Sequence, residues 1–135
     1  MKKRLFYLLI VIIITLSLAP QLAHARVSDI IKSYNVVVEA LSDGRIKAKA
    51  SVRANEITTM LGFTTILIQE YNGTKWVTVK NVNDKYGSGE SYSYTTYYNG
   101  TTGKKYRGRV SCKGVYDGVT DTRPLKSSPS SVIGK

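Results

Sequence analysis

The sequence predicts an all-β protein: a single seven-stranded antiparallel β-sandwich that follows an N-terminal signal peptide. Segments with side chains alternating between apolar and polar at period two recur along the chain, as in half-buried strands. Turn dipeptides separate these segments at short intervals. No helical periodicity appears after residue 26. Together these observations favour two packed antiparallel sheets.

The first half of the domain contains four expected strands joined by two hairpin signals. Asp43-Gly44 and Asn72-Gly73 tolerate the positive φ of a tight hairpin turn. The segment 55–62 is less regular, and we expect it to cross between the sheets. The expected strands are Lys32–Leu41, Arg45–Arg53, Phe63–Tyr71 and Lys75–Val82.

The second half contains three further strands. Residues 83–90 form the longest internal polar run and are expected to be a loop. Asp117-Gly118 marks another turn, and Pro124 is compatible with the end of an edge strand. The expected strands are Ser91–Tyr98, Lys104–Lys113 and Val119–Leu125.

The N-terminus has the three parts of a secretory signal peptide. A basic start precedes fifteen uncharged residues from Leu5 to Ala19, and small residues stand at Ala23 and Ala25. We therefore expect cleavage after Ala25, a secreted protein and no transmembrane span; an uncleaved N-terminal anchor is the alternative. Residues 1–25 are the signal peptide, 26–126 the β-sandwich domain and 127–135 a flexible tail.

The composition of residues 26–135 argues against catalysis. Cleavage would remove His24, the only histidine, and with it the usual proton shuttle at neutral pH. Cys112 is the only cysteine and is expected to be buried, although an intermolecular disulfide remains an alternative. Asp84, Asp117 and Asp121 could supply oxygen ligands to calcium, but the spacing of a calcium-binding loop is not present. We expect no enzyme activity, catalytic residue, metal site or cofactor.

One segment resembles a known strand. It is similar to strand F of immunoglobulin and fibronectin type III sandwiches and reads Gly103-Lys104-Lys105-Tyr106-Arg107-Gly108-Arg109-Val110-Ser111-Cys112. The resemblance implies that Tyr106 has the structural role of a tyrosine corner, with its hydroxyl bonded to nearby backbone. The paired cysteines and the strand-C tryptophan of immunoglobulins are absent, which favours a fibronectin-like variant or one specific to the family.

The chain also resembles small secreted proteins of Gram-positive bacteria that have no assigned function. The resemblance covers nearly the whole of residues 26–135 and implies a fold without implying an activity. The matching motifs are Val36-Val37-Val38, Ile46-Lys47, Met60-Leu61-Gly62, Ile66-Leu67-Ile68, Trp76-Val77-Thr78-Val79, Gly103-Lys104-Lys105-Tyr106 and Asp121-Thr122-Arg123.

Aromatic and basic side chains are the candidate ligand-binding groups. Tyrosine rings and Trp76 can stack on sugars or peptides, although β-propensity alone also explains tyrosines in strands. One basic stripe, with Lys105, Arg107 and Arg109, follows one expected strand, and a second stripe follows the expected strand Arg45–Arg53. The alternative interpretation of both stripes is a solvated charged face that binds no ligand. The candidate binding residues are Trp76, Tyr92, Tyr94, Tyr97, Tyr98, Lys105, Arg107 and Arg109.

The charge of residues 26–135 favours an anionic partner. Removal of Lys2, Lys3 and Arg4 leaves 17 basic against 9 acidic side chains, a net charge of +8. We expect a monomeric binding or adhesion module that engages a cell-surface or wall carbohydrate or anionic polymer, without specific nucleic-acid recognition. A bacteriocin-like or membrane-active effector is one alternative, and a purely structural or protein-partner module is another.

Overall fold

The protein is an all-β structure, as the sequence predicts, without helix in the part of the chain that the structure describes. The computed structural model describes residues 29–135, so the predicted signal peptide lies outside the described residues. No described segment is a helix with the length and apolarity that a membrane span requires. The strands are β1 (Ile31–Ala40), β2 (Arg45–Tyr71), β3 (Trp76–Asn99), β4 (Lys105–Tyr116), β5 (Val119–Ser127) and β6 (Val132–Ile133).

Residues 29–135 thus contain six strands, and the prediction of seven is wrong. Two pairs of expected strands are each one continuous strand: β2 has 27 residues and β3 has 24. The segment expected to be a polar loop, 83–90, pairs with β2 instead. Positive φ at Asp84 (54°) and Gly89 (104°) allows the strand to continue through irregular positions. Polar composition suggested a loop here, but bulged edge strands are also polar.

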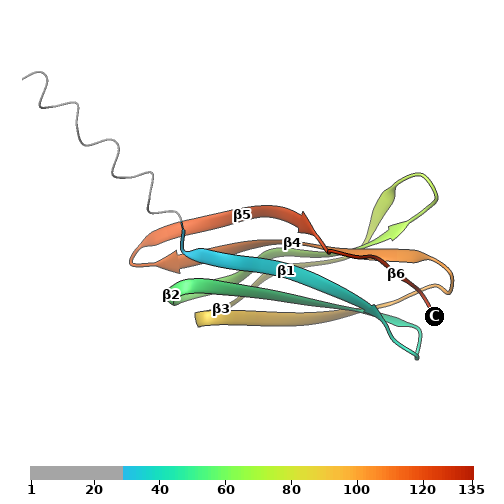
Figure 1. Cartoon of the computed structure of the whole chain (residues 1–135), viewed down its shortest axis with the longest axis horizontal. Helices are drawn as coiled ribbons and strands as arrows, with labels where there is room; N and C mark the ends of the chain where they lie inside the picture. The colour runs from blue at the N-terminus through green and yellow to red at the C-terminus, as the bar shows by residue number, and fades with distance from the viewer. Residues whose placement is uncertain (1–28) are drawn as a thin grey trace, which may run out of the picture.

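All pairings are antiparallel and join the strands into one hydrogen-bonded sheet. Its order is β1-β2-β4-β5, with β3 on the other side of β2 and β6 beside β4. Figure 1 shows β5 along the top of the sheet and the second half of β3 along the bottom. The first half of β2 lies between β1 and the end of β3, and its second half lies between β4 and the start of β3.

The long β2–β3 hairpin bends so that its two halves face each other. Pairing registers shift between Arg53 and Leu61, where we expected the chain to cross. Beyond the bend, Phe63 contacts Tyr92, with ring centroids 5.9 Å apart. Strand β1 also approaches β4 closely at Gly108. A Cβ added there would lie only 2.8 Å from Cγ2 of Val36. The shared core between the halves includes the fully buried Ile46, Leu61, Phe63, Ile66, Ile68 and Val110.

Buried polar groups attach β1 to β5. The carboxylate of Asp121, which is 5% exposed, accepts a hydrogen bond of 3.0 Å from the backbone N–H of Ile31. The same Oδ2 accepts a 3.0 Å bond from Nη2 of Arg123. Nη2 of Arg123 also donates to the carbonyl of Ile31 at 3.2 Å. One ion pair therefore satisfies both backbone groups of Ile31.

The C-terminal segment is ordered along β4 and differs from the flexible tail predicted for 127–135. Backbone N–H of Ser128 donates to the carbonyl of Gly108 at 2.8 Å, and β6 pairs with Lys105 and Tyr106. Gly134 donates its N–H to the carbonyl of Lys104 at 2.8 Å. The Ser- and Pro-rich composition suggested disorder, but backbone hydrogen bonds to β4 require no particular side chain.

Tyr106 is fully buried beside the turn that precedes β4. Its hydroxyl accepts a 2.8 Å hydrogen bond from the backbone N–H of Thr101 and donates a 2.6 Å bond to Oε2 of Glu70. Burial, followed by the bond to Glu70, raises the pKa of Tyr106. The bond to Thr101 connects the hydroxyl to backbone five residues upstream.

Candidate functional site

Three candidate binding residues lie on the outer face of β4. Lys105, Arg107 and Arg109 alternate with the buried Tyr106, Gly108 and Val110, so period two directs them away from the core. On the neighbouring β2 they pair with Tyr71, Gln69 and Leu67. We call this surface the β4 basic face; it consists of Gln69, Tyr71, Trp76, Lys105, Arg107 and Arg109.

Trp76 joins this face because it begins β3 opposite Tyr71. The guanidinium carbon of Arg107 lies 4.5 Å from the centroid of the Trp76 ring, a cation–π contact. Nε of Arg107 donates a 2.8 Å hydrogen bond to Oε1 of Gln69, whose Nε2 donates to Thr78 at 3.2 Å. These contacts fix the guanidinium of Arg107 beside the indole ring.

The β4 basic face contains positive charge without a compensating carboxylate. Among residues 29–135, the ion pairs involve Arg45, Lys47 and Arg123, and none includes a cation of this face. Nε of Arg109 is buried and has no hydrogen-bond partner within this described part of the chain. Burial, and then the charge of Arg109, lowers the pKa of Arg107. An anionic group placed between the two guanidinium groups would relieve this repulsion.

The tyrosines predicted to share the site with Trp76 lie elsewhere. Tyr92, Tyr94 and Tyr98 are partly buried and pack against the core. The ring of Tyr98 lies 6.1 Å from that of Tyr106. Tyr97 does point outward and is 43% exposed, but it pairs with Lys47 near the opposite end of β3 from Trp76. The structure therefore brings Trp76 together with Arg107 of β4 and separates it from the tyrosine cluster.

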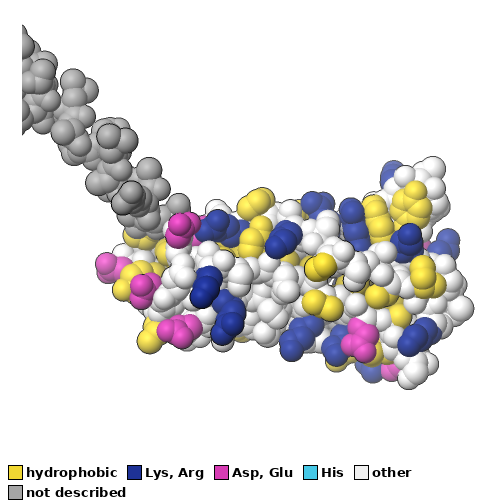
Figure 2. All heavy atoms as spheres, viewed as in Figure 1, with side chains coloured by type: hydrophobic (Ala, Val, Ile, Leu, Met, Phe, Trp, Pro, Cys, Tyr) yellow, Lys and Arg dark blue, Asp and Glu magenta, His cyan; other side chains and the backbone are white. Residues whose placement is uncertain are grey.

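The second basic stripe occupies a different outer surface. Lys47 and Lys49 lie between Glu39 and Val37 of β1 and Tyr97 and Thr95 of β3. Nζ of Lys47 lies 3.3 Å from Oε2 of Glu39, and Arg45 pairs with Asp43 at 2.7 Å. Figure 2 shows Lys and Arg spread along the visible face, with several acidic side chains at the end that contains the β4–β5 turn.

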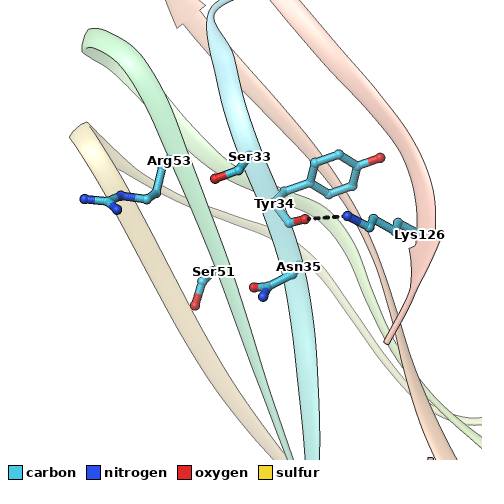
Figure 3. Close-up of a pocket in the computed structure, with 6 residues that line it drawn as sticks. All are labelled: Ser33, Tyr34, Asn35, Ser51, Arg53 and Lys126. Carbon is cyan, nitrogen blue, oxygen red and sulfur yellow. Dashed lines mark hydrogen bonds between the residues drawn. The ribbon is translucent and has the colours of Figure 1, made fainter. Parts of the chain in front are cut away.

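A shallow hollow of about 410 Å³ lies between β1, β2 and β5, and no pattern in the sequence indicated it. Figure 3 shows its lining, in which Nζ of Lys126 donates to the carbonyl of Tyr34 at 3.4 Å. Lys126 comes from the far end of the chain, so no local pattern places it beside β1. The lining residues are Ser33, Tyr34, Asn35, Ser51, Arg53 and Lys126.

Neither a cluster of metal ligands nor an accessible thiol is found in the described range, 29–135. No three His, Cys, Asp or Glu side chains gather there as metal ligands would. Cys112 is fully buried in β4, and burial raises the pKa of its thiol to about 12. A buried thiol with a raised pKa contains little of the thiolate that acts as a nucleophile.

We expect Cys112 to be unreactive in the folded protein. At pH 8 a thiol-specific reagent should modify it only on the time scale of unfolding, because the thiolate is both rare and inaccessible. Adding urea above the unfolding midpoint should give rapid modification of one thiol per chain. Reducing agent should leave the urea midpoint unchanged. Rapid modification in buffer alone, or a midpoint lowered by reductant, would contradict burial of a free thiol.

Comparisons with known proteins add little to this geometry. No protein-family model matches the sequence, and no curated protein is significantly similar to it. A crystal structure of a protein from Archaeoglobus fulgidus is similar at 16% identity and a TM-score of 0.34, covering 78% of this chain and 98% of that one. A similarity this weak supports no argument about fold or function.

Proposed function

We propose that the protein is a secreted, non-enzymatic binding module that engages an anionic carbohydrate or polymer at the cell surface through the β4 basic face. The observation that supports this most strongly is the placement of Arg107 against Trp76, with Arg109 two residues further along the same face of β4 and neither arginine in an ion pair among residues 29–135. Guanidinium groups donate pairs of hydrogen bonds to phosphate, sulfate and carboxylate groups. An indole ring beside them offers an apolar surface to the sugar or chain that links these groups.

We also propose the finer assignment of the fold, an immunoglobulin- or fibronectin type III-like sandwich, and a kinship with small secreted proteins of Gram-positive bacteria. The bent β2–β3 hairpin and the approach of β1 to β4 at Gly108 support two facing layers. The backbone contact of Tyr106 with Thr101 supports the comparison with strand F. Export rests on the N-terminal sequence, with cleavage after Ala25.

Trp76 provides a direct test because it is the only tryptophan. Titration with heparin or polygalacturonate should change its fluorescence, since an anion that binds Arg107 alters the charge 4.5 Å from the ring. Uncharged dextran serves as the comparison polymer. Binding should weaken with increasing salt, as counterion release requires. Absence of binding to both anionic polymers at low salt would show that the proposal is wrong.

A matched pair of double variants separates a site from general charge. Arg107→Gln with Arg109→Gln should weaken heparin binding by about tenfold or more, because bidentate contacts are lost. Lys47→Gln with Lys49→Gln removes the same charge from the other outer face and should have a much smaller effect. Equal losses for both pairs would indicate attraction to net charge only and would contradict a site on the β4 basic face.

A further inference from the structure

The free edge of β3 is an unusual feature of this sheet. Within residues 29–135, β3 pairs with β2 along one side and with no strand along the other. Its last nine residues, Ser91–Asn99, pair without a register shift with Arg45–Arg53. This straight segment therefore presents alternate backbone N–H and C=O groups that lack a partner strand. Such an edge is a template for another strand.

The other long edges are protected. On β1, the side chains of Asp121 and Arg123 occupy the backbone groups of Ile31, and Lys126 donates to the carbonyl of Tyr34. Strand β5 contains Pro124 among charged residues, and proline cannot donate a ladder hydrogen bond. Both are common ways to prevent edge pairing.

The edge formed by Ser91–Asn99 has none of these protections. The segment Ser-Tyr-Ser-Tyr-Thr-Thr-Tyr-Tyr-Asn contains no charge, proline or glycine. Tyrosine and threonine favour strands, and uncharged segments of this type pair readily with copies of themselves. No side chain of residues 29–135 donates to or accepts from the backbone of this segment. Composition and exposure thus point to the same occupant, a second copy of the segment.

We propose that two copies of this chain associate by antiparallel pairing of Ser91–Asn99 along the free edges of β3. Full overlap of the nine residues places Thr95 opposite the same residue of the second copy. In that register Tyr92 faces Tyr98 of the second copy, a pairing that aromatic cross-strand contacts stabilise. A two-fold axis relates the two copies in this register, so the association is complete with two chains and gives a dimer. This replaces the monomer expected from the sequence and goes beyond the proposed function.

The basic side chains of β2 are compatible with this dimer. Three strand spacings, roughly 14 Å, separate β2 from its copy across the two β3 strands. This distance exceeds the Debye length of about 8 Å at physiological ionic strength, so repulsion between the two stripes is largely screened. The association constant should therefore increase with salt, whereas binding to a polyanion should decrease. The two proposals consequently give opposite salt dependences.

Sedimentation equilibrium of the purified protein in 0.5 M NaCl tests the proposal. The wild type should approach twice its monomer mass as concentration rises. Thr95→Lys and Thr95→Glu each place like charges opposite each other at the two-fold axis. Each should lower the association constant by about tenfold or more, because juxtaposed like charges are strongly unfavourable. An equimolar mixture of the two variants should restore the dimer, since lysine then faces glutamate.

Controls keep the result specific to β3. Thr95 pairs with Lys49 within the chain, so Thr95→Glu adds a favourable neighbour and should not unfold the protein. Asn35→Glu, at an exposed position of β1, should leave the dimer unchanged. A wild type that stays monomeric, assembly beyond the dimer, or a dimer unaffected by Thr95→Glu would each overturn the proposal. A variant that loses polyanion binding but still forms the dimer would not contradict the β3 dimer.

Discussion

Replacing Gly62 by alanine is expected to lower the free energy of unfolding by about 3 kcal/mol or more, at the upper end of the cost of overpacking a core. Gly62 lies in β2 where β3 crosses very close to it. A Cβ there would lie 2.0 Å from the carbonyl oxygen of Lys85 and 2.6 Å from Cα of Tyr86. Both atoms belong to the backbone, so a side-chain rotation cannot relieve the overlap. To accommodate the alanine, strands β2 and β3 would have to move apart at this position.

Gly114→Ala is the matched control, because Gly114 is also a buried strand glycine. Its added Cβ would lie 3.2 Å from Cγ2 of Ile30 and 3.3 Å from Cγ1 of Ile31, which are side-chain atoms that can adjust. We expect a change within about 1 kcal/mol for this variant. Urea denaturation monitored by tryptophan fluorescence measures both. Similar stabilities for the two variants would contradict the close approach at Gly62.

Asp121→Ala should lower the free energy of unfolding by about 2–4 kcal/mol. The substitution leaves the N–H of Ile31 and the guanidinium of Arg123 without their buried carboxylate. Arg123 is partly exposed and also contacts Asp29 at 3.4 Å, which limits the loss. Asp121→Asn, which retains an acceptor oxygen without the charge, should fall between wild type and alanine.

The control for Asp121 is an exposed ion pair. Asp43 and Arg45 lie 2.7 Å apart, but their side chains are 49% and 45% exposed. Asp43→Ala should therefore shift the midpoint of the same urea titration far less than Asp121→Ala does. An Asp121→Ala variant as stable as Asp43→Ala would show that the buried carboxylate does not hold β1 against β5.

Local patterns were sufficient to predict most of the strands. The turn at Gly44, with φ of 85°, and the turn at Asp117 and Gly118, with φ of 48° and 72°, lie where the dipeptides predict them. The continuity of β2 and β3 was not predictable in this way. Irregular positions near Thr58 and Gly89 connect the expected strands of each pair. These positions belong to β2 and β3 because Thr58 and Gly89 pair with each other across the two strands.

The candidate site was predicted in part. Period two was enough to place Arg107 and Arg109 on one face, because alternation is a property of the strand itself. The sequence could not show that Trp76 lies over Arg107, since the register between β3, β2 and β4 determines that contact. Nor could it show that Tyr92, Tyr94 and Tyr98 face the core, because tyrosine is compatible with either face of a strand.

The bent hairpin of β2 and β3 also determines how the protein can come apart. Each half of β2 is the neighbour of different strands, β1 in the first half and β4 in the second. Both halves nevertheless contribute side chains to one core, so unfolding of either half would expose apolar side chains of the other. Within residues 29–135, the protein therefore cannot be divided into two folding units without cutting through the core that both halves of β2 build.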